Sequence, residues 1–185
     1  MAVAMTSEAD VLRLVASRLQ AAGIPYMLSG SMAFNFYTTP RMTRDIDIVV
    51  ELQSAGVEKL LQTFRPDFYI DAEMIRGALE HCLPFNIIHL ASVTKVDLIP
   101  HKQTEYQRST FQRMMSLQFG GEQISVISPE DLIISKLLWA KDSLSEVQLR
   151  DVKKLLETCP DLDMNYMEQW VNQLGLTKPF SLAKE

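Results

Sequence analysis

The stretch from Leu28 to Val50, LSGSMAFNFYTTPRMTRDIDIVV, places Asp45 and Asp47 one residue apart within an apolar run. In a β-strand, alternate side chains share a face and lie about 6.6 Å apart, so the two carboxylates can converge while Ile46 and Ile48 face the core. Two neighbouring anions repel each other, and a bound cation removes that cost. Mg²⁺ takes carboxylate oxygens and is completed by water and substrate phosphates, so we expect magnesium here.

The beginning of the same stretch has the features of a phosphate site. Gly30 and Ser31 stand between an expected strand and an expected helix. Glycine lets the backbone approach a ligand closely, serine adds a hydroxyl, and the free N–H groups of a helix start favour an anion. We therefore expect Gly30 and Ser31 to bind nucleotide phosphates. Arg44, next to Asp45, is a candidate for neutralising their charge, or an ordinary exposed loop arginine.

A third carboxylate comes from the segment TKVDLIP, where Asp97 lies between Val96 and Leu98. On the two-residue period of a strand, Lys95, Asp97 and Ile99 share a face. Taken alone, an Asp-x-Asp pair at a strand start is also typical of a solvated edge or a cap. The Gly-Ser pair upstream and a strand-borne Asp97 favour a site instead.

Two further candidates lie on expected helices near the C-terminus. Lys136 is in the middle of a helix that is apolar almost all round, so its ammonium must either extend to water or meet an anion, from a nucleotide or from a carboxylate. Asp151 follows Arg150 on the next helix, and its simplest interpretation is an exposed pair with Lys154.

These motifs resemble the nucleotidyltransferase superfamily, whose fold is shared with DNA polymerase β. Its signature is Gly-Ser or Gly-Gly, about ten residues, then Asp-x-Asp/Glu; here thirteen residues separate Ser31 from Asp45. The segments SPEDLI and RDV resemble AbiEii-type toxin nucleotidyltransferases and small stand-alone relatives. The resemblance implies that Lys136 and Asp151 belong to the active site, that Asp45, Asp47 and Asp97 hold two Mg²⁺ ions, and that an antitoxin is a possible partner.

The elements expected around these residues make an α+β fold, with a mixed sheet flanked by helices. We expect a nucleotidyltransferase core over residues 1–127 and a helical segment over 128–185 that packs on it. The expected strands and helices are, in chain order, a helix capped by Ser7 and Asp10, a strand from Pro25 to Ser29, a helix from Met32 to Tyr37, strands from Asp45 to Val50, Phe85 to Leu90 and Lys95 to Ile99, a hairpin around Gly120 and Gly121, and helices over Pro129 to Lys141, Ser145 to Thr158 and Asn165 to Leu174.

Composition narrows the class of protein. The 185 residues, 47% of them hydrophobic, fit one domain with a modest extension. A net charge of −5 disfavours strong non-specific nucleic-acid binding. No apolar run approaches the ~18 residues of a membrane span, and the start, MAVAMTSEAD, lacks the features of a secretory signal. Two unpaired cysteines without metal spacing favour a cytoplasmic protein.

We therefore expect Mg²⁺-dependent transfer of a nucleoside monophosphate from an NTP to a hydroxyl. The acceptor is open between RNA, protein and a small molecule, and a toxin–antitoxin or phage-defence setting is one expectation. The alternative is a nucleotide- or protein-binding module of the same fold without turnover. The segment from His101 to Arg113 interleaves basic and aromatic residues, which indicates either an RNA groove or an ordinary amphipathic helix.

Overall fold

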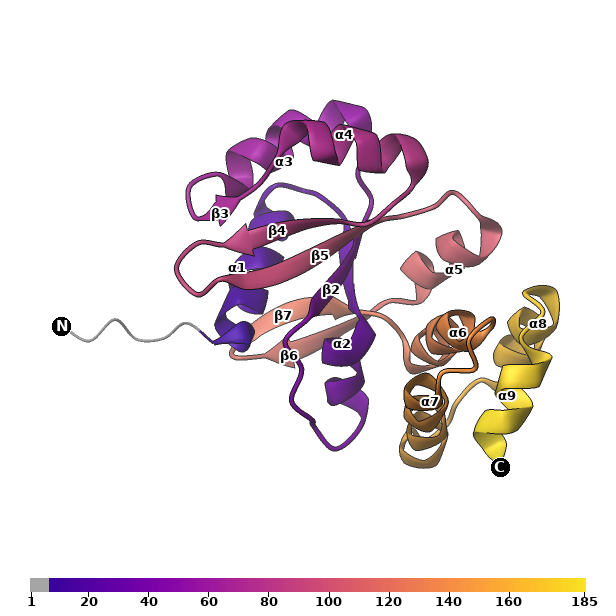
Figure 1. The fold of residues 1–185 in the computed structure, drawn as a ribbon. Helices are drawn as coiled ribbons and strands as arrows, with labels where there is room; N and C mark the ends of the chain where they lie inside the picture. The colour runs from indigo at the N-terminus through magenta and orange to yellow at the C-terminus, as the bar shows by residue number, and fades with distance from the viewer. Residues whose placement is uncertain (1–6) are drawn as a thin grey trace.

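The computed structural model describes residues 7–185 and places seven strands in one mixed sheet (Figure 1). The sheet order is β3-β4-β5-β2-β1-β7-β6, with β2 parallel to β5, β1 parallel to β7 and the other neighbours antiparallel. The strands are β1 Tyr26–Ser29, β2 Ile46–Val50, β3 Phe68–Tyr69, β4 Phe85–His89, β5 Thr94–Pro100, β6 Met115–Phe119 and β7 Glu122–Val126.

Helices surround this sheet and continue beyond it toward the C-terminus. They are α1 Glu8–Ala21, α2 Gly30–Tyr37, the 3₁₀ turn η1 Ser54–Gly56, α3 Val57–Phe64, α4 Ala72–His81, α5 Glu105–Arg113, α6 Pro129–Ala140, α7 Glu146–Thr158, α8 Met164–Gln173 and α9 Thr177–Lys184. α1 contacts β1, β7 and α3, whereas α2 contacts β1 and β2 together with α6 and α7. The C-terminal helices therefore meet the sheet through α2.

Local sequence explains the two best-defined helix starts. Ser7 caps α1 by accepting a hydrogen bond from the Asp10 N–H, and the Asp10 carboxylate accepts one from the Ser7 N–H in return. Ser128 caps α6 in the same way through the Asp131 N–H, with Pro129 at the first helical position. Both starts match the expectation from the sequence.

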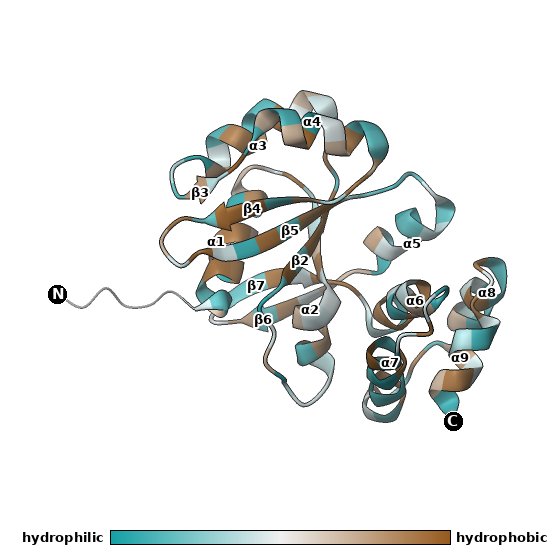
Figure 2. Cartoon of the chain, in the orientation of Figure 1, coloured by the Kyte–Doolittle hydropathy of each residue, from teal (hydrophilic) through white to brown (hydrophobic). Residues whose placement is uncertain are grey.

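The two faces of the sheet differ in burial, and this difference positions the site. Alternate residues of β2 and β5, among them Ile46, Ile48 and Leu98, are fully buried, while Asp47 and Asp97 on the opposite face are partly exposed. Figure 2 shows β2, β4 and β5 as largely hydrophobic, with hydrophilic residues on the surrounding helices. A strand that is buried on one face can present carboxylates on the other.

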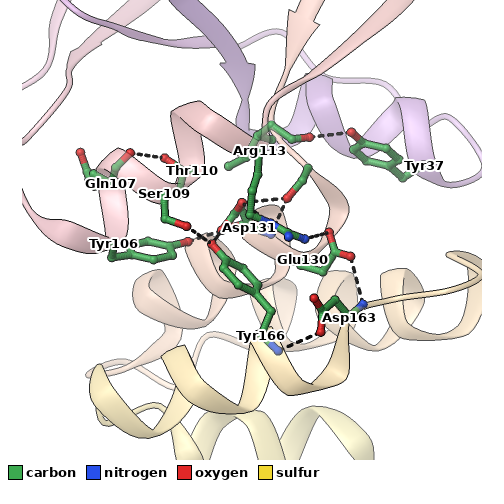
Figure 3. A network of polar contacts seen from close by, with 12 residues as sticks. Tyr37, Tyr106, Gln107, Ser109, Thr110, Arg113, Glu130, Asp131, Asp163 and Tyr166 are labelled. Atoms are coloured by element: carbon green, nitrogen blue, oxygen red, sulfur yellow. Dashed lines mark hydrogen bonds and ion pairs between the residues drawn. The ribbon is translucent and has the colours of Figure 1, made fainter.

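A partly buried polar network connects α6 and α8 to α5 (Figure 3). The Arg113 guanidinium lies 3.2 Å from a Glu130 carboxylate oxygen and 4.0 Å from the centre of the Tyr166 ring. The Tyr166 hydroxyl donates a 2.7 Å hydrogen bond to Asp131, and the Asp163 N–H donates to Glu130. α5, α6 and α8 are thus held by charged groups as well as by apolar packing.

The α+β class and the mixed sheet are confirmed, with corrections to some boundaries. β2 begins at Ile46, so Asp45 lies just before the strand rather than in it. α2 begins at Gly30, so Ser31 is in the helix and not in a preceding turn. The boundary expected at residue 127 falls between β7 and α6, and the division into domains stays a prediction.

The predictions on membrane spans and on a secretory signal concern different parts of the chain. Within residues 7–185, none of the helices combines the length and the apolar character needed to cross a bilayer. The segment MAVAMTSEAD is expected to lack a secretory signal. Its first six residues lie outside the described residues.

Candidate active site

Strand register brings the Asp-x-Asp motif, the third aspartate and the Gly-Ser pair together. Asp47 on β2 is the register partner of Asp97 on parallel β5. On its other side Asp47 is opposite Ser29 of β1, the residue directly before Gly30. Neighbouring strands lie about 4.8 Å apart, so these groups form one cluster at one end of β2.

Gly30 is required by the position of Asp47. Its φ of +62° lies in the left-handed region, and a Cβ added to it would overlap the Asp47 carboxylate. The backbone at the start of α2 therefore lies directly against that carboxylate. A side chain at position 30 would displace Asp47 and strain the turn.

Burial and like charges make Asp47 hard to ionise. Burial raises the pKa of Asp47, and the charges of Asp97 and Asp45 raise it further, while Lys95 and Lys136 act in the opposite direction. Asp45 itself is exposed, yet its charge reaches Asp47. A cation among these carboxylates would relieve the repulsion.

Lys95 supplies part of the positive charge that these carboxylates need. Its ammonium lies 2.8 Å from an Asp97 carboxylate oxygen, and this hydrogen bond raises the pKa of Lys95. The ammonium stands where a metal cation would neutralise Asp97. The sequence placed Lys95 on the same face as Asp97, and the ion pair agrees with that placement.

The carboxylate oxygens of the site supply only part of the ligands that Mg²⁺ requires. Among residues 7–185, no three His, Cys, Asp or Glu side chains are arranged so that they could hold a metal ion by themselves. Asp47 and Asp97 nevertheless offer the carboxylate oxygens that Mg²⁺ prefers, and Mg²⁺ commonly binds through one or two carboxylates plus substrate phosphates. The residues present therefore suit an ion that arrives with a nucleotide.

Lys136 and Asp151 form a buried ion pair, with 3% and 5% of their surfaces exposed. The Lys136 ammonium lies 2.8 Å from the Asp151 carboxylate and 5.4 Å from the centre of the Phe34 ring on α2. Extension of Lys136 to water is thus wrong, and so is an exposed pair of Asp151 with Lys154. Among the open alternatives, a carboxylate proves to be the anion that Lys136 meets.

Arg41 joins this ion pair to the Gly-Ser pair, and the sequence analysis missed it. Its Nη2 donates to the Asp151 carboxylate at 2.9 Å and to the Ser31 hydroxyl at 3.1 Å. Arg44, chosen because it precedes Asp45, is exposed and makes no hydrogen bond or ion pair within residues 7–185. No periodic pattern singles out Arg41, because it lies in an irregular loop.

The fold is similar to several solved structures. No family model and no curated protein matches the chain. One is an antigenic nucleotidyltransferase-like protein from Paracoccidioides brasiliensis, with a TM-score of 0.60 and 18% identity over 95% of this chain and 91% of that one. Another is the antibiotic-resistance factor ANT(2'')-Ia, at 0.58 and 12%, covering 92% of each chain. A third is the lincosamide antibiotic adenylyltransferase LnuA bound to lincomycin, at 0.53 and 15%, covering 84% and 100%.

The chain has the nucleotidyltransferase fold. The similarity spans nearly all of this chain and of the P. brasiliensis protein, so the helices after α6 are part of the shared architecture. The nearer resemblance to AbiEii-type proteins stays a prediction.

α5 packs one face against the C-terminal helices and leaves the other exposed. Tyr106 is buried and its hydroxyl donates to the Asp131 carbonyl, and Arg113 is bound to Glu130. Tyr106 and Arg113 are thus engaged inside the protein, whereas Lys102 and Arg108 are exposed.

Proposed function

We propose that this protein is a Mg²⁺-dependent nucleotidyltransferase that moves a nucleoside monophosphate from an NTP to an acceptor hydroxyl. The observation that carries the proposal is the register of Asp47 with Asp97 beside the Gly30 backbone. This arrangement sets paired carboxylates against the start of a helix, which are the two things that a metal-bound triphosphate needs.

Each site residue has a definite role in this proposal. Gly30 and Ser31 hold phosphate oxygens through the N-terminus of α2 and the Ser31 hydroxyl. Asp47 and Asp97, with Asp45 directly before the strand, would hold Mg²⁺ together with the phosphates of a bound nucleotide, and the metal would supply charge stabilisation to the attacking and leaving oxygens. Asp97 accepts the proton of the acceptor hydroxyl. Lys136 and Asp151 set the charge beside the phosphates, and Lys136 acts on Asp47 across the site.

The type of phosphate site indicates which bond forms and which bond breaks. The chain has no GxxxxGK[ST] motif and hence no lysine of the kind that P-loop enzymes direct at the β- and γ-phosphates. The acceptor oxygen therefore bonds to the α-phosphorus, the bond from the α-phosphorus to its bridging oxygen breaks, and pyrophosphate leaves.

A small hydroxyl-bearing molecule is the first acceptor class to test. The similar LnuA structure is described as a lincosamide antibiotic adenylyltransferase, and ANT(2'')-Ia as an antibiotic-resistance factor. The engagement of Arg113 and Tyr106 disfavours an RNA groove along α5. RNA ends and protein hydroxyls remain the other acceptor classes.

Labelling decides between these acceptors and between turnover and binding alone. The protein is incubated with Mg²⁺ and each α-³²P-labelled NTP, first with aminoglycosides and lincosamides and then with a cell extract. The proposal expects label on one acceptor and an equal amount of pyrophosphate, both lost in Asp97→Ala. Label from γ-³²P NTP, or orthophosphate without pyrophosphate, would identify a kinase or a hydrolase. NTP binding without transfer to any acceptor would support the non-catalytic module.

A cytoplasmic toxin with an antitoxin partner is the second candidate setting. The buried pair of Lys136 and Asp151 supports it, because those are the two residues that the AbiEii resemblance assigns to an active site. Induced expression should then arrest growth of the host cell, and Asp47→Asn should abolish the arrest. Normal growth with active protein would remove the toxin setting and leave the transferase proposal in place.

A further inference from the structure

The loop between α2 and β2 is anchored so that the position of Arg41 is fixed. The Asn35 side chain of α2 donates to the Arg41 carbonyl at 2.8 Å and accepts from the Arg41 N–H at 3.0 Å. One side chain thus holds both backbone groups of one loop residue. Such pairing limits the movement of the Arg41 backbone relative to the start of α2.

The Arg41 guanidinium is held on one side and open on the other. Nη2 makes both contacts, to Ser31 and to Asp151, and Cζ lies 5.4 Å from the centre of the Phe34 ring. The side chain is 42% exposed, and Nε and Nη1 make no hydrogen bond within residues 7–185. A guanidinium has five N–H donors, so three are left for an anion.

Charge around Arg41 also favours an anion. Lys136 and Arg41 share the single carboxylate of Asp151, so the cluster of three side chains carries one net positive charge. This charge lies where α2, α6 and α7 meet (Figure 1), next to the Ser31 hydroxyl. Lys136 also acts on Asp47, so this positive charge lies beside the carboxylates of the candidate phosphate site.

We infer that Arg41 binds the β- and γ-phosphates of the NTP, with Asn35 and Asp151 as the residues that position it. The inference rests on the proposed function and assigns to Arg41 the role that the sequence suggested for Arg44. Arginine suits this role because its planar fork of N–H donors can grip two phosphate oxygens at once. Arg44 lies three residues along the same loop, is exposed and makes no hydrogen bond or ion pair within residues 7–185, so it is the matched control.

Comparing the binding of ATP with that of AMP distinguishes a contact between Arg41 and the β- and γ-phosphates from a purely structural role of Arg41. Isothermal titration calorimetry in Mg²⁺ measures both ligands on wild type, Arg41→Ala, Arg41→Gln and Arg44→Ala. We expect Arg41→Ala and Arg41→Gln to raise the Kd for ATP roughly tenfold or more and to change that for AMP by less than about twofold. Arg44→Ala should bind both ligands like wild type. Arg41→Gln keeps hydrogen-bonding atoms, so it tests the charge even where Arg41→Ala unfolds.

The outcomes separate this inference from the function on which it rests. If wild type binds ATP and both Arg41 variants bind it equally well, the inference is wrong and the transferase proposal stands. Equal weakening for ATP and AMP would make Arg41 a structural tie only. If wild type binds none of the four NTPs in Mg²⁺, the proposed function itself fails and this inference fails with it.

Discussion

At the scale of single residues, Asp47 combines a structural cost with the function that we propose for it. Burial and two neighbouring carboxylates raise its pKa. A group whose pKa is higher in the folded than in the unfolded state favours folding while it is protonated. Its contribution is present below the unfolded value, near the ordinary 3.8, and is lost as the pH rises through the folded pKa.

Asp47→Asn should therefore stabilise the metal-free protein at neutral pH. Asparagine keeps the shape and removes the charge, so the variant should melt at a higher temperature than wild type at pH 7 in EDTA. The difference should shrink as the pH falls toward 3.8, where Asp47 of the wild type is protonated. Thermal unfolding across pH measures this, with Asp142→Asn, an exposed site, as control. A variant that melts with wild type at every pH would show that Asp47 is not under strain.

Lys136, on the other side of the site, should contribute both to folding stability and to nucleotide affinity. In Lys136→Met, Asp151 keeps Arg41 as a partner, so the loss of folding stability should be about 1–3 kcal/mol, below the usual cost of breaking a buried pair. Nucleotide affinity should fall roughly tenfold, because the neutral side chain no longer attracts the phosphates.

A double variant tells stability from function at Lys136. Lys136→Met with Asp151→Asn removes the unpaired charge and keeps a side-chain oxygen for Arg41, so it should recover stability without recovering ATP binding. Denaturant unfolding and calorimetry measure the two quantities, and Lys154→Met on the exposed side of α7 is the control. Wild-type affinity for ATP in Lys136→Met would remove Lys136 from the nucleotide site.

At the scale of elements, α6 does more than its sequence indicated. The N-cap and the apolar positions predicted the helix and nearly its exact extent. Acidic residues in a first helical turn ordinarily face water, yet Glu130 and Asp131 are both buried and bound to other elements. A helix pattern shows which face is apolar, but not which distant cation will neutralise a buried carboxylate.

Arg113 should therefore be a stability residue. Arg113→Met leaves Glu130 and Asp131 without their cation, and we expect a loss of about 1–3 kcal/mol, reduced from the fully buried case because Arg113 is 31% exposed. Arg108→Met on the exposed side of α5 should change little. Chemical denaturation of both variants at pH 7 measures the difference, and equal stability of the two would contradict the role of the network.

At the scale of the whole molecule, the sequence predicted the fold class and the carboxylate site, and failed on contacts between segments. Period-two alternation placed Asp47 and Asp97 on strands, the resemblance to nucleotidyltransferases implied that they share a site, and the strand register brings them together. The sequence could not place Arg41, because a loop residue is fixed by Asn35 and Asp151, which no local pattern connects to it. The pairing of Lys136 with Asp151 likewise depends on how α7 folds back on α6.

The candidate site spans both halves of the chain, and this arrangement has a measurable consequence. The carboxylates and the Gly-Ser pair belong to the sheet and α2, whereas Lys136 and Asp151 belong to α6 and α7. A ligand that contacts both groups stabilises both, and at about 100 times its Kd it stabilises the folded state by about 2.7 kcal/mol.

Hydrogen exchange should show this coupling directly. With Mg²⁺-ATP, amides of β2, β5, the first turn of α2 and the facing turns of α6 and α7 should exchange more slowly than in the free protein, because local opening of either half must first release the ligand. Amides of α4, which packs on α3 and β4 away from these helices, should slow only as far as global unfolding controls them. Asp47→Asn with the same ligand should show none of these changes. Slower exchange confined to the sheet and α2, with α6 and α7 unchanged, would show that the nucleotide binds without the Lys136–Asp151 pair and would limit that pair to holding the helices together.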